Sequence, residues 1–363
     1  MLDRIHLREI DWVLIGLLMV NSAIGLVLIQ GASYFLHGGF VVKQAVWILV
    51  SLLFLLLLLT VDYKILMDLA PYAYAVFLMA LLVILVLGKA ERGHKSWIGL
   101  AFMGGQPSEL AKIVVILMLA RVFSGFKSMY VTAPATLVSG AVTAGPLLLV
   151  AVQPDLGTAM SILFLWLGGL ALAGMNRRTL VIILIAAVVL SFFSWQFLLK
   201  DYQKTRLKTI IDPLHDPRGS GYHVLQSKIA IGSGGVVGKG FMKGSQSQLR
   251  FLPARHTDFI FSVLGEEFGF LGVCVVLGSY FLLLARIFRA VGQTRDRAGL
   301  FIVFLCGCMV TFPFMVNVLM IIGLFPVTGV PIPLLSYGGS SLLSTYLAVG
   351  LVANVKLRRF AYA

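Results

Sequence analysis

One apolar stretch of the sequence carries an unusual set of charges. Residues 252–272, LPARHTDFIFSVLGEEFGFLG, are long enough to cross a bilayer, yet they open with Arg255, His256 and Asp258 and carry Glu266 and Glu267 further along. Ionisable side chains at membrane depth are costly and commonly functional. On a helix, Glu266 would lie about 12 Å from Asp258, outside the roughly 5–9.5 Å that separates the paired carboxylates of glycoside hydrolases. The pattern favours one base with cationic help, although an Asp at this place could instead cap the helix.

Two further polar clusters fall at the starts of apolar stretches. In QPSELAK, residues 106–112, Glu109 and Lys112 are three residues apart and share a helical face, so they can pair. This pair could serve a site or could close a helix bundle, because structural ion pairs also occupy buried positions. In QPDLGTA, residues 153–159, Asp155 is either a member of the same site or an N-cap.

The last polar cluster is TGVPIPLLSYGGSS, residues 328–341, which includes Ser336 and Tyr337. Two prolines interrupt the regular backbone. Irregular backbone at membrane depth is tolerated where it is buried in protein or lines a cavity. We expect a re-entrant or cavity-lining segment at the mouth of the last helix, unless the prolines and serines only start that helix.

The elements that must hold these side chains are transmembrane helices. Hydrophobic residues make up 59% of the chain, charged residues only 12%, and the mean hydropathy is +0.97. Runs this long without alternation exclude a β-barrel. We therefore predict an all-α integral membrane protein, a polytopic bundle of ten transmembrane helices in one domain, residues 1–363. Its windows of about 20 apolar residues lie near 12–32, 41–60, 66–88, 107–125, 131–152, 156–174, 179–199, 258–285, 299–322 and 333–355.

Basic residues orient the bundle. If the N-terminus is cytoplasmic, the inside segments hold most of the Lys and Arg residues of the short loops, whereas the short outside loops hold only Lys89, Arg92 and Lys95. The positive-inside rule then places both termini in the cytoplasm. The remaining connection, residues 200–257, becomes one long extracytoplasmic loop.

This long loop carries ten Lys or Arg residues, Lys239, Arg250 and Arg255 among them. That excess predicts an anionic partner on the outer face. Within the loop, HVLQSKIAIGSGGVVGKGF is expected to lie at the membrane interface as a short amphipathic helix that ends at Gly232. Its glycines do not make a phosphate loop, because Ser233 stands where Walker A requires Gly. We expect no nucleotide and no nucleic acid as ligands.

Six motifs in this order, KSWIGL, QPSELAK, QPDLGTA, GYHVLQSKIAIGSGG, LPARHTDFIFSVLGEE and PIPLLSYGGSS, make the chain resemble the SEDS family (shape, elongation, division and sporulation) of bacterial peptidoglycan polymerases. The resemblance covers essentially the whole chain and is greater to the elongation branch than to the division branch. It implies a multi-pass protein of the bacterial cytoplasmic (inner) membrane. The implied activity is a glycosyltransferase that polymerises lipid II, the undecaprenyl-pyrophosphate-linked disaccharide pentapeptide, during cell elongation and shape maintenance.

The resemblance assigns residues to this activity. Asp258 matches the family position regarded as catalytic, and Glu109, Lys112 and Asp155 match positions in the central polar cavity. The expected substrate-binding residues are Glu109, Lys112, Asp155, Lys239, Arg250, Arg255, His256, Ser336 and Tyr337. A departing pyrophosphate needs stabilisation by Lys, Arg or a divalent cation such as Mg²⁺ or Mn²⁺. The sequence leaves open whether a metal binds.

The same resemblance implies protein partners. It implies a complex with a class B penicillin-binding protein, the transpeptidase that cross-links new strands, and with other membrane proteins of the elongation complex. We expect the single membrane helix of that partner to pack on the eighth and ninth helices, where Gly265, Gly269 and Gly272 offer a close-approach surface. The rival hypothesis is a lipid II flippase, against which the absence of repeated halves argues.

Overall fold

All ten predicted membrane helices are present in the computed structural model. It describes residues 10–34, 39–87, 89–91, 94–97, 106–126, 131–212, 216, 219–249, 251–252 and 254–358. The long helices are α1 (Trp12–Ser33), α2 (Phe40–Thr60), α3 (Tyr63–Leu87), α4 (Pro107–Gly125), α5 (Ala133–Val152), α6 (Leu156–Leu172), α7 (Arg177–Phe193), α11 (Ile260–Val291), α12 (Arg297–Ile321) and α13 (Gly339–Leu357).

Length and apolar composition suit eight of these helices for crossing a membrane. The shorter apolar helix α6 has 17 residues, and α4 carries Glu109, Lys112 and Arg121 within its 19. The chain is thus a polytopic all-α membrane protein, as predicted. The smaller elements are a hairpin of β1 (Lys89–Glu91) and β2 (His94–Trp97), a π-helical turn that extends α7 (Ser194–Leu198), and three helices of the long loop, α8 (Asp201–Ile211), α9 (Ser220–Gly234) and α10 (Ser245–Gln248).

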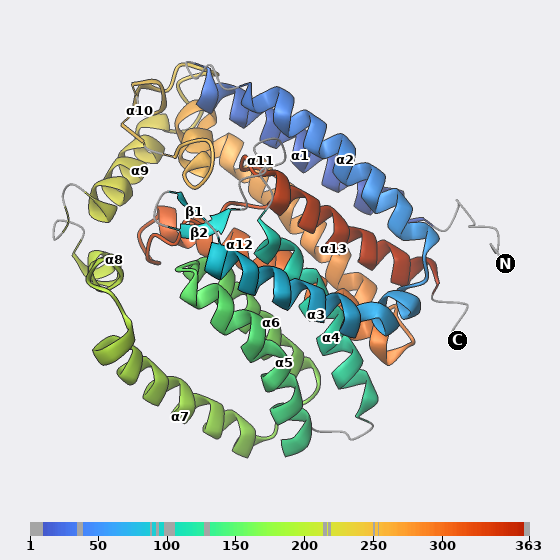
Figure 1. Ribbon diagram of the computed structural model, residues 1–363. Coiled ribbons are helices and arrows are strands. Elements are labelled where there is room, and N and C mark those ends of the chain that lie inside the picture. Colours follow the sequence, from blue (N-terminus) through green and yellow to red (C-terminus); the bar gives the residue numbers. More distant parts are fainter. Residues whose placement is uncertain are drawn as a thin grey trace.

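Helix α12 forms the centre of the bundle. It packs against α4, α6, α11 and α13, and 72% of its most apolar window is buried. Helices α1, α2 and α13 lie together on one side, and α3 to α6 lie on the other (Figure 1). Helix α7 stands apart from the bundle, and none of its residues is buried. The polar side chains that the sequence singles out are therefore held by a core to which α7 adds no buried residue.

The two ends of the bundle differ in chemistry. Helix α1 begins and helix α13 ends at the same end of the bundle, which is called the tail end (Figure 1). There Asp11, whose side chain is 1% exposed, accepts from Arg286 at 2.8 Å and from Lys356 at 2.6 Å. This ion-pair network joins α1, α11 and α13. The opposite end, where α4, α6, α11 and α13 begin, is called the loop end because the long loop lies against it.

Helix α11 is broken at Gly269, and the long loop repairs the break. Gly269 has φ 63° and ψ −163°, a region that is essentially restricted to glycine. Four backbone bonds replace those that the break removes: Lys239 N–H to Glu266 C=O (3.0 Å), Gly240 N–H to Glu267 C=O (2.9 Å), Phe270 N–H to Gly235 C=O (2.9 Å) and Leu271 N–H to Val236 C=O (3.1 Å). The stretch after α9 thus pairs with both halves of α11, as unsatisfied backbone at membrane depth requires.

This arrangement corrects two of our expectations. Helix α9 ends at Gly234, not Gly232, and it packs into the protein against α11 instead of only lying on the membrane. Consequently, Gly265 and Gly269 do not offer a surface for another protein. A Cβ at Gly265 would meet Ile231 of α9 at 3.0 Å, and one at Gly269 would collide with the backbone nitrogen of Gly238. The small residues serve close approach, but their partner is this chain's own loop.

We expect Gly269→Ala to destabilise the protein strongly. The backbone conformation alone costs a residue with a Cβ about 1–3 kcal/mol, and the added methyl group would also collide with the loop backbone. Gly278 lies on the same helix, and a Cβ added there would meet nothing within 4 Å, so Gly278→Ala is a matched control. Thermal unfolding of both variants in detergent should show a loss only for Gly269→Ala, and equal midpoints would contradict the role of the break.

Candidate active site

Asp258 lies in a turn, not in a helix. Residues 254–259 form consecutive turns before α11, and Ala254 has a positive φ of 49°. The N-cap residue of α11 is Phe259, with no side-chain capping bond. Asp258 is therefore not the N-cap that the sequence left as an alternative. Since no helix fixes this turn, its position depends on bonds from other segments.

Those bonds reach three successive carbonyls of the turn. The donors come from α12 and from the irregular segment 328–338, which precedes α13. They are Tyr337 N–H to His256 C=O (2.9 Å), Ser336 Oγ to Thr257 C=O (2.6 Å) and Asn317 Nδ2 to Asp258 C=O (2.8 Å). We call this set the carbonyl clamp. It brings the predicted residues His256, Asp258, Ser336 and Tyr337 together.

Aromatic and amide contacts reinforce the clamp from α2. The Phe40 ring lies 4.8 Å from the ring of His256 and 5.0 Å from that of Tyr337. Gln44 donates to the Ser336 carbonyl and accepts from the Gly338 N–H, both at 3.2 Å. The expected irregular segment is thus present, and α13 begins only at Gly339. Ser336 uses its hydroxyl within the protein, because it also accepts from the Ile332 N–H at 2.9 Å.

A second polar group joins α4, α6 and α13. Lys112 donates to Glu109 at 2.8 Å, with side chains only 4% and 9% exposed, and Ser344 donates to the other oxygen of Glu109 at 3.1 Å. Asp155 caps α6 by accepting from the Thr158 N–H at 3.1 Å, and it also accepts from Gln106. Burial raises the pKa of Asp155, despite the opposing hydrogen bonds from Thr158. The Glu109–Lys112 ion pair and the Asp155 cap, which the sequence left as alternatives to a functional role, are therefore both present. Neither contact excludes a role of these residues in an active site.

Residues 328–330 connect the two polar groups. A Cβ at Gly157, in the first turn of α6, would collide with the Val330 side chain. A Cβ at Gly329 would lie 3.5 Å from a carboxylate oxygen of Asp258. The same short strip therefore contacts the helix that Asp155 caps on one side and Asp258 on the other. Asp258, Asp155, Glu109 and Lys112 belong to one region at the loop end.

The two buried glutamates of α11 hold the long loop. Glu266, which is fully buried, accepts from Lys239 Nζ (2.8 Å) and from the N–H groups of Gln246 (2.8 Å) and Ser247 (3.0 Å). Gln248 reaches the Gly31 carbonyl at 3.0 Å and lies 3.5 Å from Glu267. These carboxylates are thus kept at membrane depth because they bind a loop whose backbone needs partners.

The remaining predicted binding residues lie in this loop or beside it. Lys239 is paired with Glu266, and Arg255 is buried and donates to the Ser247 carbonyl. Arg255 thereby links the loop to the turn that contains Asp258. Arg250 lies outside the described residues. Whether these cations contact a substrate stays a prediction.

Our sequence reasoning missed four polar residues of the site: Gln44, Gln106, Asn317 and Ser344. Each interrupts or precedes an apolar stretch, and that isolated polarity is a signal, because polar side chains inside a membrane usually bond across helices. Their partners elsewhere in the site lie 13 to 294 residues away along the chain. Sequence alone could have identified these residues as candidates but not their partners.

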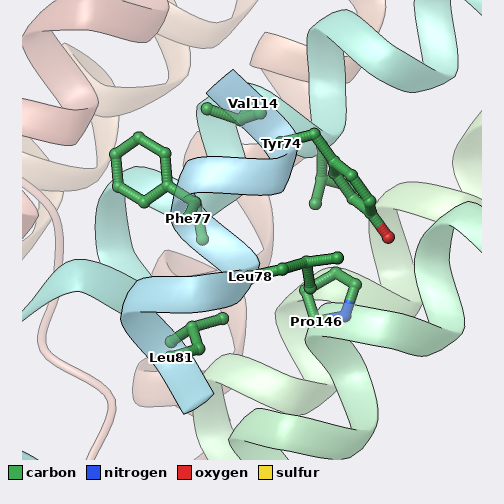
Figure 2. Close-up of a pocket in the computed structure, with 8 residues that line it drawn as sticks. Tyr74, Phe77, Leu78, Leu81, Val114 and Pro146 are labelled. Carbon is green, nitrogen blue, oxygen red and sulfur yellow. The ribbon is translucent and has the colours of Figure 1, made fainter. Parts of the chain in front are cut away.

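A small apolar pocket between α3, α4 and α5 lies apart from this chemistry. Tyr74, Phe77, Leu78 and Leu81 of α3 line it together with Pro146 and residues of α4 (Figure 2). Pro146 cannot bond the carbonyl four residues earlier, and the Tyr74 hydroxyl donates to that Val142 carbonyl at 2.6 Å. With the Tyr74 hydroxyl bonded in this way, the surface of the pocket is apolar.

Comparisons with known proteins agree with one another. The family model of the cell cycle proteins FtsW, RodA and SpoVE matches residues 6–360. The peptidoglycan glycosyltransferase MrdB of Escherichia coli K12 is 36% identical over 362 residues, which cover 98% of this chain and 95% of MrdB. The peptidoglycan glycosyltransferase RodA of Treponema pallidum is 31% identical, with 97% and 98% covered. A probable peptidoglycan glycosyltransferase FtsW of Trichlorobacter lovleyi is 33% identical, with 96% and 94% covered.

Solved structures share the fold over nearly the whole chain. One chain of a peptidoglycan synthase complex, described as coordinating polymerization and crosslinking, superposes with a TM-score of 0.83 at 32% identity, covering 97% of this chain and 98% of the other. The rod shape determining protein RodA of Thermus thermophilus superposes with a TM-score of 0.73 at 30% identity and the same coverage.

The contribution of the buried Glu109–Lys112 ion pair to the stability of the protein can be tested. Removing one member of a buried ion pair strands the other charge and costs about 3–5 kcal/mol, whereas replacing both is often nearly neutral. We expect Glu109→Gln or Lys112→Met to lower the unfolding midpoint more than the double variant does. The Arg121–Asp68 pair, whose side chains are 43% and 73% exposed, supplies a control, since Arg121→Met should change little. A double variant as unstable as the sum of the singles would contradict the buried pair.

Proposed function

This chain belongs to the family of cell cycle proteins FtsW, RodA and SpoVE, and we propose that it polymerises lipid II into β-1,4 glycan strands. It is a peptidoglycan glycosyltransferase of the kind that its relatives MrdB and RodA represent. The observation that carries the proposal is the carbonyl clamp, which holds Asp258 in a turn at the same end as Glu109, Lys112 and Asp155. The elongation-type relatives favour a role in cell elongation and shape.

The proposed reaction is a direct displacement at the sugar. The 4-hydroxyl oxygen of the acceptor attacks the anomeric carbon of the donor, its proton passes to the Asp258 carboxylate, and undecaprenyl pyrophosphate leaves with the bonding electron pair. One activated hydroxyl inverts the donor carbon, from an α-linked pyrophosphate to a β-linked glycan. A positioned base is typically worth about 10² to 10⁴ in rate. Lys112, Lys239, Arg250, Arg255 and His256 are the proposed cationic groups for the pyrophosphate.

A divalent cation, Mg²⁺ or Mn²⁺, remains a proposal without an assigned step. In the described part of the chain, no three His, Cys, Asp or Glu side chains come together as a metal site. The pairing of Glu109 with Lys112 also supplies charge compensation without a metal. Cationic side chains are the groups of this chain that we propose to stabilise the leaving group, with or without such a cation.

We further propose that the loop end faces the outside of the bacterial inner membrane and that both termini are cytoplasmic. The positive-inside rule supports this orientation, since Arg286, Lys356 and Arg358 gather at the tail end. It would place Asp258 on the side where cell wall is built.

The proposed partner is a class B penicillin-binding protein. A structural relative belongs to a peptidoglycan synthase complex that combines polymerization with crosslinking. The glycines Gly265 and Gly269 are no longer candidates for its docking site. On the C-terminal side of the break, α11 exposes the apolar side chains Phe270, Val275 and Phe281. These side chains are our proposed contact for a membrane helix of the partner. Other proteins of the elongation complex stay a proposal.

The flippase alternative predicts different behaviour of the purified protein. A transporter would move lipid II across a bilayer without making polymer. The names of the relatives favour polymerisation. In addition, the proposed polar residues gather at one end of the bundle, not at its midplane, where transporters bind.

We predict that Asp258→Asn lowers glycan synthesis by at least about 10²-fold, because a base is lost while its shape is kept. Purified protein incubated with lipid II, with the product resolved by gel electrophoresis, measures this. Asp201→Asn, at an exposed residue of α8, is the matched control and should polymerise normally. Near-normal synthesis by folded Asp258→Asn protein would remove Asp258 from the mechanism, and wild-type protein that makes no polymer would favour the flippase.

A further inference from the structure

Asn317 occupies a special place in the carbonyl clamp. It lies near the end of α12, the central helix, and is fully buried. Its side-chain nitrogen donates to the Asp258 carbonyl at 2.8 Å and to the Val330 carbonyl at 2.7 Å. One amide group therefore binds two segments that are both irregular. The other two donors of the clamp, Ser336 and Tyr337, belong to one of those segments, which Gln44 of α2 and Tyr280 of α11 also bind. Asn317 differs from them because one side chain binds both segments at once.

The two acceptors of Asn317 lie in the Asp258 turn and in residues 328–330, which contact the Asp258 carboxylate. Val330 contacts α6 at Gly157, and the neighbouring Gly329 lies beside the carboxylate of Asp258. Gly329 has a positive φ of 71°, so its strip follows a path that favours glycine. The Asn317 amide thus sets the separation between the Asp258 turn and residues 328–330, and through them the separation from the helix that Asp155 caps.

The precision of this separation matters for a base. Reacting groups must lie about 3–3.5 Å apart with aligned orbitals, and a displacement near 1 Å can cost about 10²-fold in rate. The bonds within the turn, from the N–H groups of Thr257, Asp258 and Phe259 to the Ala254 carbonyl, shape it but do not attach it to the rest of the bundle. Helix α12 is packed on several sides, so it provides a rigid reference for both segments.

We propose that Asn317 is a positioning residue for the polymerisation reaction, which holds the Asp258 turn and residues 328–330 at a fixed separation. The proposal rests on the proposed function and adds a residue that touches no substrate. It acts through the main chain of Asp258, so its loss changes the rate of the chemical step more than the binding of lipid II.

The chain offers a matched control for the test. Asn354 in α13 is also fully buried, and its side-chain nitrogen also donates to two carbonyls, those of Leu58 (2.5 Å) and Val61 (2.6 Å). These bonds lie at the tail end, away from Asp258. Asn317→Ser and Asn354→Ser therefore remove the same kind of buried bonds from opposite ends of the bundle.

The experiment compares purified wild type, Asn317→Ser and Asn354→Ser for unfolding midpoint and for kcat and KM with lipid II. Both variants should lose stability. Only Asn317→Ser should lose kcat, by about 10- to 100-fold, with KM within about threefold of wild type, as expected when ground-state binding is kept. Equal losses of kcat in both variants, or a kcat of Asn317→Ser within about threefold of wild type, would overturn the proposal.

A variant that does not fold and a wild type that makes no polymer have separate consequences. If Asn317→Ser does not fold, Asn317→Gln tests the same claim, because it keeps an amide donor but displaces it by one methylene from the Asp258 and Val330 carbonyls. Wild-type kcat in folded Asn317→Gln would then overturn the proposal. Wild-type protein that makes no polymer contradicts the proposed function, whereas an active wild type with an equally active Asn317→Ser contradicts this inference alone.

Discussion

Backbone N–H and C=O groups at membrane depth must find partners inside the protein, because lipid supplies none. Helices meet this requirement within themselves. At the loop end, however, α11 is broken at Gly269, the Asp258 turn precedes a helix, and residues 328–338 run irregularly towards α13. The free backbone groups of each of these segments bond to another segment. Disruption of one non-helical part of the site should therefore disturb the others.

Buried polar side chains make many of the bonds that join these non-helical segments. Glu266 binds the loop that repairs the break, and Arg255 connects that loop to the Asp258 turn. From the other side, Ser336, Tyr337 and Asn317 bind the carbonyls of the same turn. The proposed base is therefore displayed on a short irregular turn that is held from both sides.

The sequence predicts the helices well and the irregular parts poorly. Apolar windows locate all ten long helices because length and hydropathy decide which segments cross a membrane. The apolar window 333–355 overlaps the irregular segment expected at 328–341, and the structure keeps the irregular backbone up to Gly338, so that α13 begins later than the window. The pairing of Glu109 with Lys112 was predictable because the residues are three apart on one helix. In contrast, the role of Gly265 was wrongly predicted, because nothing local shows that α9 returns to cover it. Asn317 was missed for the same reason, since its acceptors lie in other segments.

Hydrogen exchange measured by mass spectrometry tests most directly whether the irregular segments form one unit. The account predicts slow exchange for peptides that cover 254–259 and 328–338 in the wild-type protein. Both should exchange faster together in Asn317→Ser, while peptides from α7 stay unchanged, because α7 shares no bond with the clamp. Fast exchange of both segments already in wild type, or loosening of one without the other, would contradict the claim that they are held together around Asp258.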